Sequence, residues 1–161
     1  MLRLIRLTTL VAALLATSTA AAHVRAKWPP WLSIESPVNP YDGSVTGAVL
    51  LVHAATREGT PTLSDVSGAA EGVVNGARRT IALRLDATSR PGVFAVRKQW
   101  PNEGTWLLRF SLASTTALVS LDGADRVTGV SVPTRMADGR PIPRAVVARD
   151  IDSTLMVASA H

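Results

Sequence analysis

The sequence predicts an all-β sandwich of seven or eight short strands, followed by a short C-terminal helix. Apolar and polar residues alternate in short runs, which is typical of strands with one buried face. Turn-forming residues such as Asn75 and Gly76 separate these runs. Near the end of the chain, the apolar spacing changes to that of an amphipathic helix.

Composition limits the class of protein. A length of 161 residues predicts one domain, and 47% hydrophobic with 18% charged residues predicts a folded chain. The absence of cysteine excludes disulfides, thiol catalysis and thiolate metal sites. The net charge of +5 is small and most basic residues are scattered singly, so we expect no nucleic-acid partner.

Residues 1–22 have the three parts of a secretory signal peptide. Arg3 and Arg6 form the charged start, residues 7–16 are apolar, and residues 17–22 are small. The uncharged run over residues 7–24 is at the lower limit for a membrane span, so an uncleaved signal anchor is the alternative. We therefore expect a periplasmic or extracellular protein that contacts the membrane only if this segment is uncleaved.

His23 begins an N-terminal extension over residues 23–30. Cleavage after Ala22 makes His23 the first residue, and cleavage after Ala20 makes it the third. In either position the terminal amine and the imidazole can chelate Cu(II) or Ni(II). The alternative is that an alanine-rich cleavage region simply runs into a polar residue.

The sandwich is expected over residues 31–133. It begins with an edge strand at residues 31–36 and continues with an apolar strand at residues 46–54, covered on both faces. His53, near the end of that strand, is interpreted as a half-buried, hydrogen-bonded histidine, with a metal ligand as the alternative. In residues 62–74, Gly68 and Gly72 predict a short or bulged strand.

Two further hairpins are predicted. In residues 90–112, two strands flank a turn at residues 101–104, and Trp106 shares one face with Leu108 and Phe110. This element is expected to be the central hairpin of the core. Residues 117–121 and 127–132 are expected to form another hairpin around Asp122 and Asp125, whose spacing fits a turn better than a calcium site.

The last part of the chain is expected to hold a linker and a helix. Residues 134–143 contain turn residues and prolines and are interpreted as the linker. In residues 144–159, Val147, Ile151 and Leu155 lie on one helical stripe. We expect this helix to dock on the sandwich, with contact to a partner as the alternative.

Motifs for catalysis are missing from the sequence. It has no nucleophile elbow, phosphate-binding loop, dinucleotide fingerprint or zinc-protease motif. Its three histidines are far apart in the chain, at positions 23, 53 and 161. We therefore expect a protein that is not an enzyme, the alternative being a small hydrolase whose site is assembled only in space.

Residues 31–112 resemble exported immunoglobulin-like modules of the YtkA, FixH and copper-resistance CopC type. The matching positions are Pro91, Gly92 and Phe94, then Pro101, Gly104 and Trp106, then Leu108 and Phe110. The resemblance implies an immunoglobulin-like β-sandwich and a non-catalytic module of the cell envelope. Copper-binding members begin with histidine, which His23 matches, but their aspartate and second histidine have no assigned counterpart here.

The expected function is an exported binding or accessory module of the cell envelope that acts through the edges or loops of the sandwich. Its partner is expected to be an envelope protein or a small ligand. It needs no cofactor in this interpretation. The alternative is a periplasmic copper carrier that uses His23, with His53 as a second candidate metal ligand.

Overall fold

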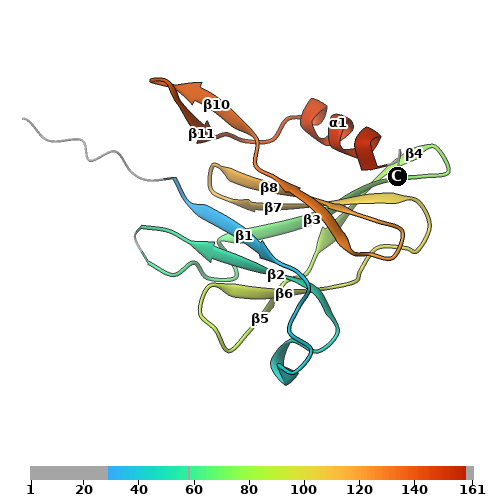
Figure 1. Ribbon diagram of the computed structural model, residues 1–161, viewed down its shortest axis with the longest axis horizontal. Coiled ribbons are helices and arrows are strands. Elements are labelled where there is room, and N and C mark those ends of the chain that lie inside the picture. The colour runs from blue at the N-terminus through green and yellow to red at the C-terminus, as the bar shows by residue number, and fades with distance from the viewer. Residues whose placement is uncertain (1–28, 58, 159–161) are drawn as a thin grey trace, which may run out of the picture.

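Two antiparallel sheets lie face to face in the computed structural model, which describes residues 29–57 and 59–158 (Figure 1). The first sheet has the order β1-β2-β6-β5, formed by β1 (Trp31–Glu35), β2 (Ala48–Ala55), β6 (Val93–Arg97) and β5 (Asp86–Ala87). The second has the order β4-β3-β7-β8-β9, formed by β4 (Ala77–Leu83), β3 (Val66–Val74), β7 (Thr105–Leu112), β8 (Thr115–Leu121) and β9 (Val127–Ser131). The remaining elements are a 3₁₀ turn (Gly43–Val45), a hairpin of β10 (Thr134–Ala137) and β11 (Arg140–Pro143), and helix α1 (Ala148–Ala158).

The strand order is that of an immunoglobulin-like sandwich. Lettered along the chain, the first sheet reads ABED and the first four strands of the second read C′CFG. The expected all-β sandwich with a C-terminal helix is confirmed. The two sheets hold nine strands rather than seven or eight, because the two-residue β5, which was not among the expected strands, adds an edge strand to the first sheet.

The core between the sheets is built by alternating residues of both. Trp106, Leu108 and Phe110 of β7 point into it, as expected from their spacing, and Leu108 and Phe110 are fully buried. Phe94 and Val96 of β6 reach the same cluster from the opposite sheet. These apolar side chains hold the two sheets together.

Strand β3 corrects the expectation of a short or bulged strand. It runs for nine residues and pairs without interruption with both β4 and β7. Gly72 lies opposite Trp106, and Gly68 lies opposite Phe110. A Cβ atom at Gly72 would lie 2.4 Å from the Trp106 ring. The glycines therefore make room for aromatic rings on the neighbouring strand, and they do not end the strand.

Residues 90–112 do not form the predicted hairpin. Strand β6 belongs to the first sheet and β7 to the second, so residues 98–104 cross between the sheets. Trp100 is buried in this crossover, and Gly104 has φ +90° where an added Cβ would lie 2.4 Å from the Val73 carbonyl oxygen. The prediction was wrong because alternation identifies the buried face of a strand but not the sheet to which the strand belongs.

Strand β2 is covered on both faces, as its apolar sequence indicates. Leu50 and Val52 face the core between the sheets. On the outer face, Leu51 packs with Val45 of the 3₁₀ turn and with Val93 of β6. The loop before β2 therefore folds over the outside of the first sheet.

The segment interpreted as a linker is a hairpin. Residues 134–143 form β10 and β11, which pair antiparallel from Thr134 with Pro143 to Ala137 with Arg140. Asp138 and Gly139 at its tip both have positive φ, as a two-residue turn of this kind requires. The hairpin stands apart from both sheets of the sandwich (Figure 1).

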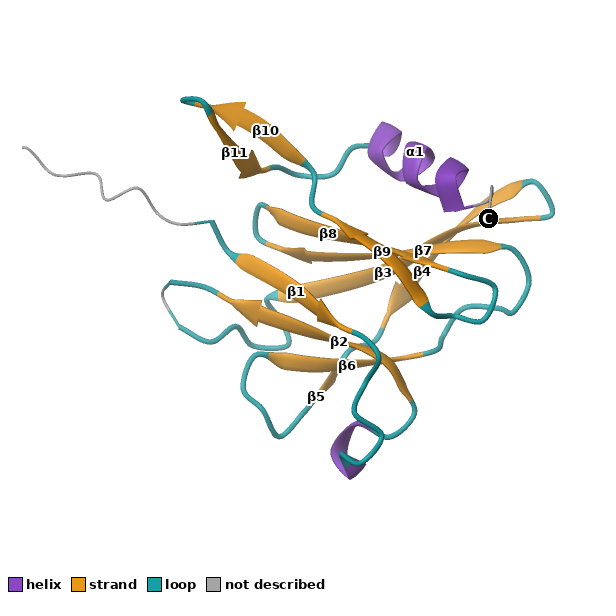
Figure 2. Ribbon diagram, in the orientation of Figure 1, coloured by secondary structure: helices purple, strands orange, loops and turns teal. Residues whose placement is uncertain are grey.

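Helix α1 docks on the outer face of the second sheet (Figure 2). Ile151 and Leu155 pack against Leu107 of β7 and Leu118 of β8. The helix begins at Ala148, four residues later than expected, so Val147 lies outside it and is exposed. Docking agrees with the expected role of the helical stripe, apart from Val147.

Candidate functional site

His53 lies on the outer face of the first sheet, where β1 and β2 pair. Its Nε2 atom is 2.8 Å from Oε2 of Glu35, and both side chains are about one-third exposed or less. Nη1 of Arg90 donates to the same carboxylate oxygen at 3.5 Å. The expectation of a half-buried, hydrogen-bonded histidine is confirmed, and its partner comes from the neighbouring strand.

The His53 pair offers two protein ligands to a metal. Among residues 29–57 and 59–158, no group of three or more histidine, aspartate or glutamate side chains is placed to hold an ion. His23, the other predicted metal ligand, lies outside the described residues. The copper hypothesis therefore depends on the N-terminal chelate and stays a prediction.

A cleft of about 350 Å³ lies between residues 101–106, where the crossover leads into β7, and the β8–β9 turn. Its two acidic residues are held in place by nearby groups. Asp122 accepts hydrogen bonds from the backbone and side chain of Arg126, which lower the pKa of this carboxyl group. Asp125 accepts from Nε1 of Trp100 at 2.8 Å and pairs with Lys98. Both carboxylates thus stabilise the turn, in agreement with the sequence-based interpretation.

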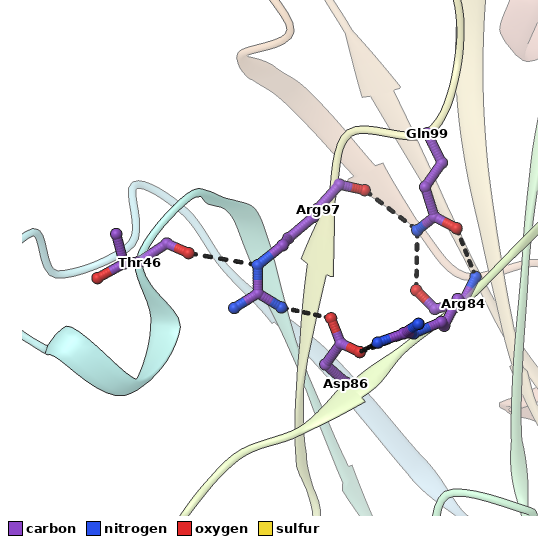
Figure 3. Close-up of polar contacts among 5 residues, drawn as sticks. All are labelled: Thr46, Arg84, Asp86, Arg97 and Gln99. Atoms are coloured by element: carbon purple, nitrogen blue, oxygen red, sulfur yellow. Dashed lines mark hydrogen bonds and ion pairs between the residues drawn. The ribbon is translucent and has the colours of Figure 1, made fainter.

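A polar network joins two of the three places where the chain passes between the sheets, the β4–β5 and β6–β7 connections (Figure 3). Asp86 pairs with Arg84 and Arg97, and the hydrogen bond from Arg84 is the main cause of its lowered pKa. The Gln99 amide accepts from the Arg84 backbone N–H at 2.8 Å and donates to its carbonyl oxygen at 2.9 Å. Arg97 also donates to the Thr46 carbonyl oxygen at 3.3 Å. These contacts hold the β4–β5 and β6–β7 connections against each other.

Glu71 is a buried charged residue that was not predicted from the sequence. It lies in β3 on the outer face of the second sheet and is only 6% exposed. Nη2 of Arg109 donates to it at 3.1 Å, and Oγ1 of Thr80 donates at 2.6 Å. The signal in the sequence was a lone carboxylate within an otherwise uncharged strand, since a carboxylate among buried residues needs a partner. These hydrogen bonds link β3 to its neighbours β4 and β7.

An open apolar groove lies at the end of the sandwich where the β2–β3 loop and the β7–β8 turn meet. The residues lining it are Pro29, Pro30, Trp31, Leu32, Ala55, Thr56, Arg57, Thr115, Val132 and Pro143. Trp31 is 56% exposed, and Arg57 is the one charged residue in this lining. Oγ1 of Thr115 donates to the Pro30 carbonyl oxygen at 2.6 Å and fixes the groove wall. The groove was not predicted from the sequence, because its lining residues are distant from one another in the chain.

Comparison with family models, curated proteins and solved structures finds no match. In the described part of the chain, no helix has the length and apolar character needed to span a membrane. Every buried side-chain nitrogen and oxygen there has a hydrogen-bond partner. Large apolar side chains are exposed at Trp31 beside the apolar groove and also at Tyr41, Met136 and Val130.

Proposed function

We propose that this chain is an exported, non-catalytic binding module of the cell envelope, which engages a partner protein at the groove beside Trp31. The observation that carries the proposal is the exposure of a large aromatic side chain at the rim of an apolar groove. Burial of such a side chain against a partner releases water from apolar surface and supplies binding free energy. Tryptophan is also among the residues most enriched at binding hot spots.

The position of the groove supports this proposal. It lies at the loop end of an immunoglobulin-like sandwich, where the β2–β3 loop and the β7–β8 turn come together. Loops on a rigid sandwich are the usual place for recognition in this architecture. The proline pair Pro29 and Pro30 limits backbone freedom on one wall, which lowers the entropy lost on binding.

The chemistry of the lining defines the partner. The groove is mainly apolar and open to solvent, and the exposed Arg57 is the one charged residue that lines it. We therefore expect an extended protein segment with apolar side chains and one acidic group. A carboxylate from the partner would pair with Arg57, and such an exposed charge acts mostly on the association rate.

A binding role agrees with the polar groups described above, because His53 and the carboxylates of the cleft already have partners within the chain. His53 is engaged by Glu35, and the acidic residues of the other cleft are engaged by Arg126, Trp100 and Lys98. A general base must reach a substrate proton, so a carboxylate committed to turn geometry is poorly suited to that task. Export is inferred from residues 1–22 of the sequence.

Site-specific photo-cross-linking in the organism that produces the protein tests the proposal. A benzoylphenylalanine residue would replace Trp31 in one variant and Ala82, exposed on β4 at the far edge of the second sheet, in the control. We expect a discrete adduct in the envelope fraction from position 31 and none from position 82. Equal labelling at both positions, or no adduct at position 31, would overturn the proposal.

A copper carrier is the second candidate function, favoured by His23 at the predicted mature N-terminus. The amine and imidazole of this residue would supply the chelate. It requires no change in the fold, since the described residues would serve only as a carrier for the metal-binding terminus.

A further inference from the structure

The sandwich has four edge strands, and three of them carry features that block strand pairing. Strand β4 presents Arg78 and Arg79, and β1 follows the prolines at 29 and 30 and ends in Glu35. Strand β5 is only two residues long. Charged residues, prolines and short length are the usual means by which edge strands avoid pairing with other chains.

Strand β9 has none of these three features, although its pairing with β8 contains a β-bulge at Thr128, where the register shifts between Ser120 and Leu121. Its sequence, Val-Thr-Gly-Val-Ser, contains no charged residue and no proline over five residues. Residues 128–131 are exposed, and Val130 is 49% exposed although it lies opposite the buried Val119. The strand therefore presents apolar surface beyond the edge of the core.

One side of β9 pairs with β8, whereas its other side has no strand partner in the described residues. No backbone hydrogen bond in that part of the chain joins its outer edge to another segment. Its outward N–H and C=O groups therefore form a row open to a further strand. A shallow groove beside it is lined by uncharged residues of β8, β9 and α1, including Ser131, Thr154 and Val157.

The sequence of β9 is compatible with pairing to itself. In an antiparallel pair centred on Gly129, Val127 of one copy lies opposite Ser131 of the other, and Thr128 lies opposite Val130. No like charges meet in this register. The groove residues beside β9 are also uncharged, so two copies related by a two-fold axis meet without electrostatic repulsion.

We propose that two copies of this chain associate by antiparallel pairing of their β9 strands, which joins the two five-stranded sheets into one continuous sheet. This inference is independent of the proposed function, because it uses β9 and not the Trp31 groove. A dimer of this kind would present two grooves to the envelope and raise the effective affinity for a repeated partner.

A disulfide test uses the absence of cysteine from the chain. A Cβ at Gly129 has no neighbour within 4 Å, so Gly129→Cys fits the monomer. Residues directly opposite in an antiparallel pair have Cα atoms about 4.5–5.5 Å apart, within the range of a disulfide. On mild oxidation we expect a covalent dimer of Gly129→Cys at least tenfold faster than of Ala82→Cys on the β4 edge. Equal rates would overturn the proposal.

Sedimentation equilibrium of the full exported chain gives a second measurement. We expect the average mass of the unmodified chain to rise towards that of a dimer with concentration. Val130→Lys should weaken association at least tenfold, because the lysines of the two copies would lie diagonally across the paired strands on the same face and would repel each other. Ala82→Lys, the same change on the opposite edge of the sheet, should leave it unaltered. A monomer at about 100 μM, well above a micromolar Kd, or equal effects of the two lysines, would contradict β9 pairing.

Discussion

Gly72 and Trp106 lie directly opposite each other on paired strands, and a Cβ atom on Gly72 would lie 2.4 Å from the indole ring. The Trp106 ring therefore occupies the space that a side chain at position 72 would need. Such pairs of a glycine and an aromatic residue on neighbouring strands also help fix strand register. The packing of the Trp106 ring from strand β7 thus explains why position 72 is a glycine.

Truncation of this ring tests its place in the core. Trp106 is 5% exposed, and its Nε1 donates to the Glu103 carbonyl oxygen at 2.8 Å. Trp106→Ala should lower the free energy of unfolding by about 3–5 kcal/mol. Urea denaturation followed by circular dichroism measures this loss. A change within about 1 kcal/mol, the usual size of a tolerated core swap, would contradict the assigned packing.

The destabilisation caused by a side chain at position 72 should depend on the Trp106 ring. Gly72→Ala is expected to destabilise the protein by about 1–3 kcal/mol, because the added methyl group overlaps the indole. In the Trp106→Leu background, most of this cost should disappear, since the smaller side chain leaves space. A double-mutant cycle measures the coupling. Additive effects of the two changes would show that the methyl group is excluded by something else.

The buried carboxylate of Glu71 gives a prediction about charge. Arg109→Met removes its cationic partner and leaves the carboxylate with Thr80 alone, which should cost about 1–3 kcal/mol. Arg84→Met is a matched control, because the Arg84 side chain is highly exposed and its pair with Asp86 should contribute about 0–1 kcal/mol. Equal losses from both variants in urea denaturation would be inconsistent with the burial of Glu71.

The lowered pKa of Asp150, at the start of helix α1, predicts that the stability of the protein depends on pH. Hydrogen bonds from the Arg144 guanidinium, and then from the Val147 backbone N–H, lower the pKa of Asp150 to about 2. A carboxyl group with a lowered folded-state pKa stabilises the protein above its unfolded pKa of 3.8 and loses that effect as the pH falls towards 2.

Asp150→Asn removes the titrating group. Its melting temperature at pH 7 should be lower than that of the unmodified chain, and it should fall less between pH 5 and about pH 2. Thermal unfolding at several pH values measures the difference. Asp152→Asn, two residues further along and paired with Arg78, is the control on the same helix. Identical pH profiles for Asp150→Asn and the unmodified chain would exclude this contribution.

The mature N-terminus is predicted from residues 17–22. We expect intact mass spectrometry of the exported protein to show a chain that begins at His23 or at Ala21. Ala20→Leu and Ala22→Leu, which place a large side chain at the cleavage sites, should slow processing. A full-length mass in the envelope fraction would instead support an uncleaved membrane anchor.

Copper binding should depend on His23 and not on His53. The His53 Nε2 atom already contacts Glu35, and no third acidic or histidine side chain of the described residues joins them. In a Cu(II) titration of the mature protein, we expect His23→Ala to abolish tight binding and His53→Ala to leave it unchanged. Loss of copper binding in His53→Ala would move the site to the β1–β2 face.

Local sequence determined which side of each strand is buried. The alternation of Trp106, Leu108 and Phe110, the turn at Asn75 and Gly76, and the docking of Ile151 all follow from the two-residue period of a strand, turn chemistry and the helical period. These signals depend on neighbours in the chain. They were therefore sufficient for the fold class and for much of the core.

The tertiary structure alone decided which strands share a sheet. Strands β6 and β7 are neighbours in sequence but belong to opposite sheets, and Glu71 meets Arg109 across 38 positions of the chain. The Trp31 groove likewise combines residues from position 29 to position 143. Periodicity reflects residues that are close in the chain, so it carries no information about such distant pairings. These pairings are stabilised only when the strands pack together in the folded protein. The sequence by itself thus determined the buried faces, and three-dimensional packing decided sheet membership and the groove.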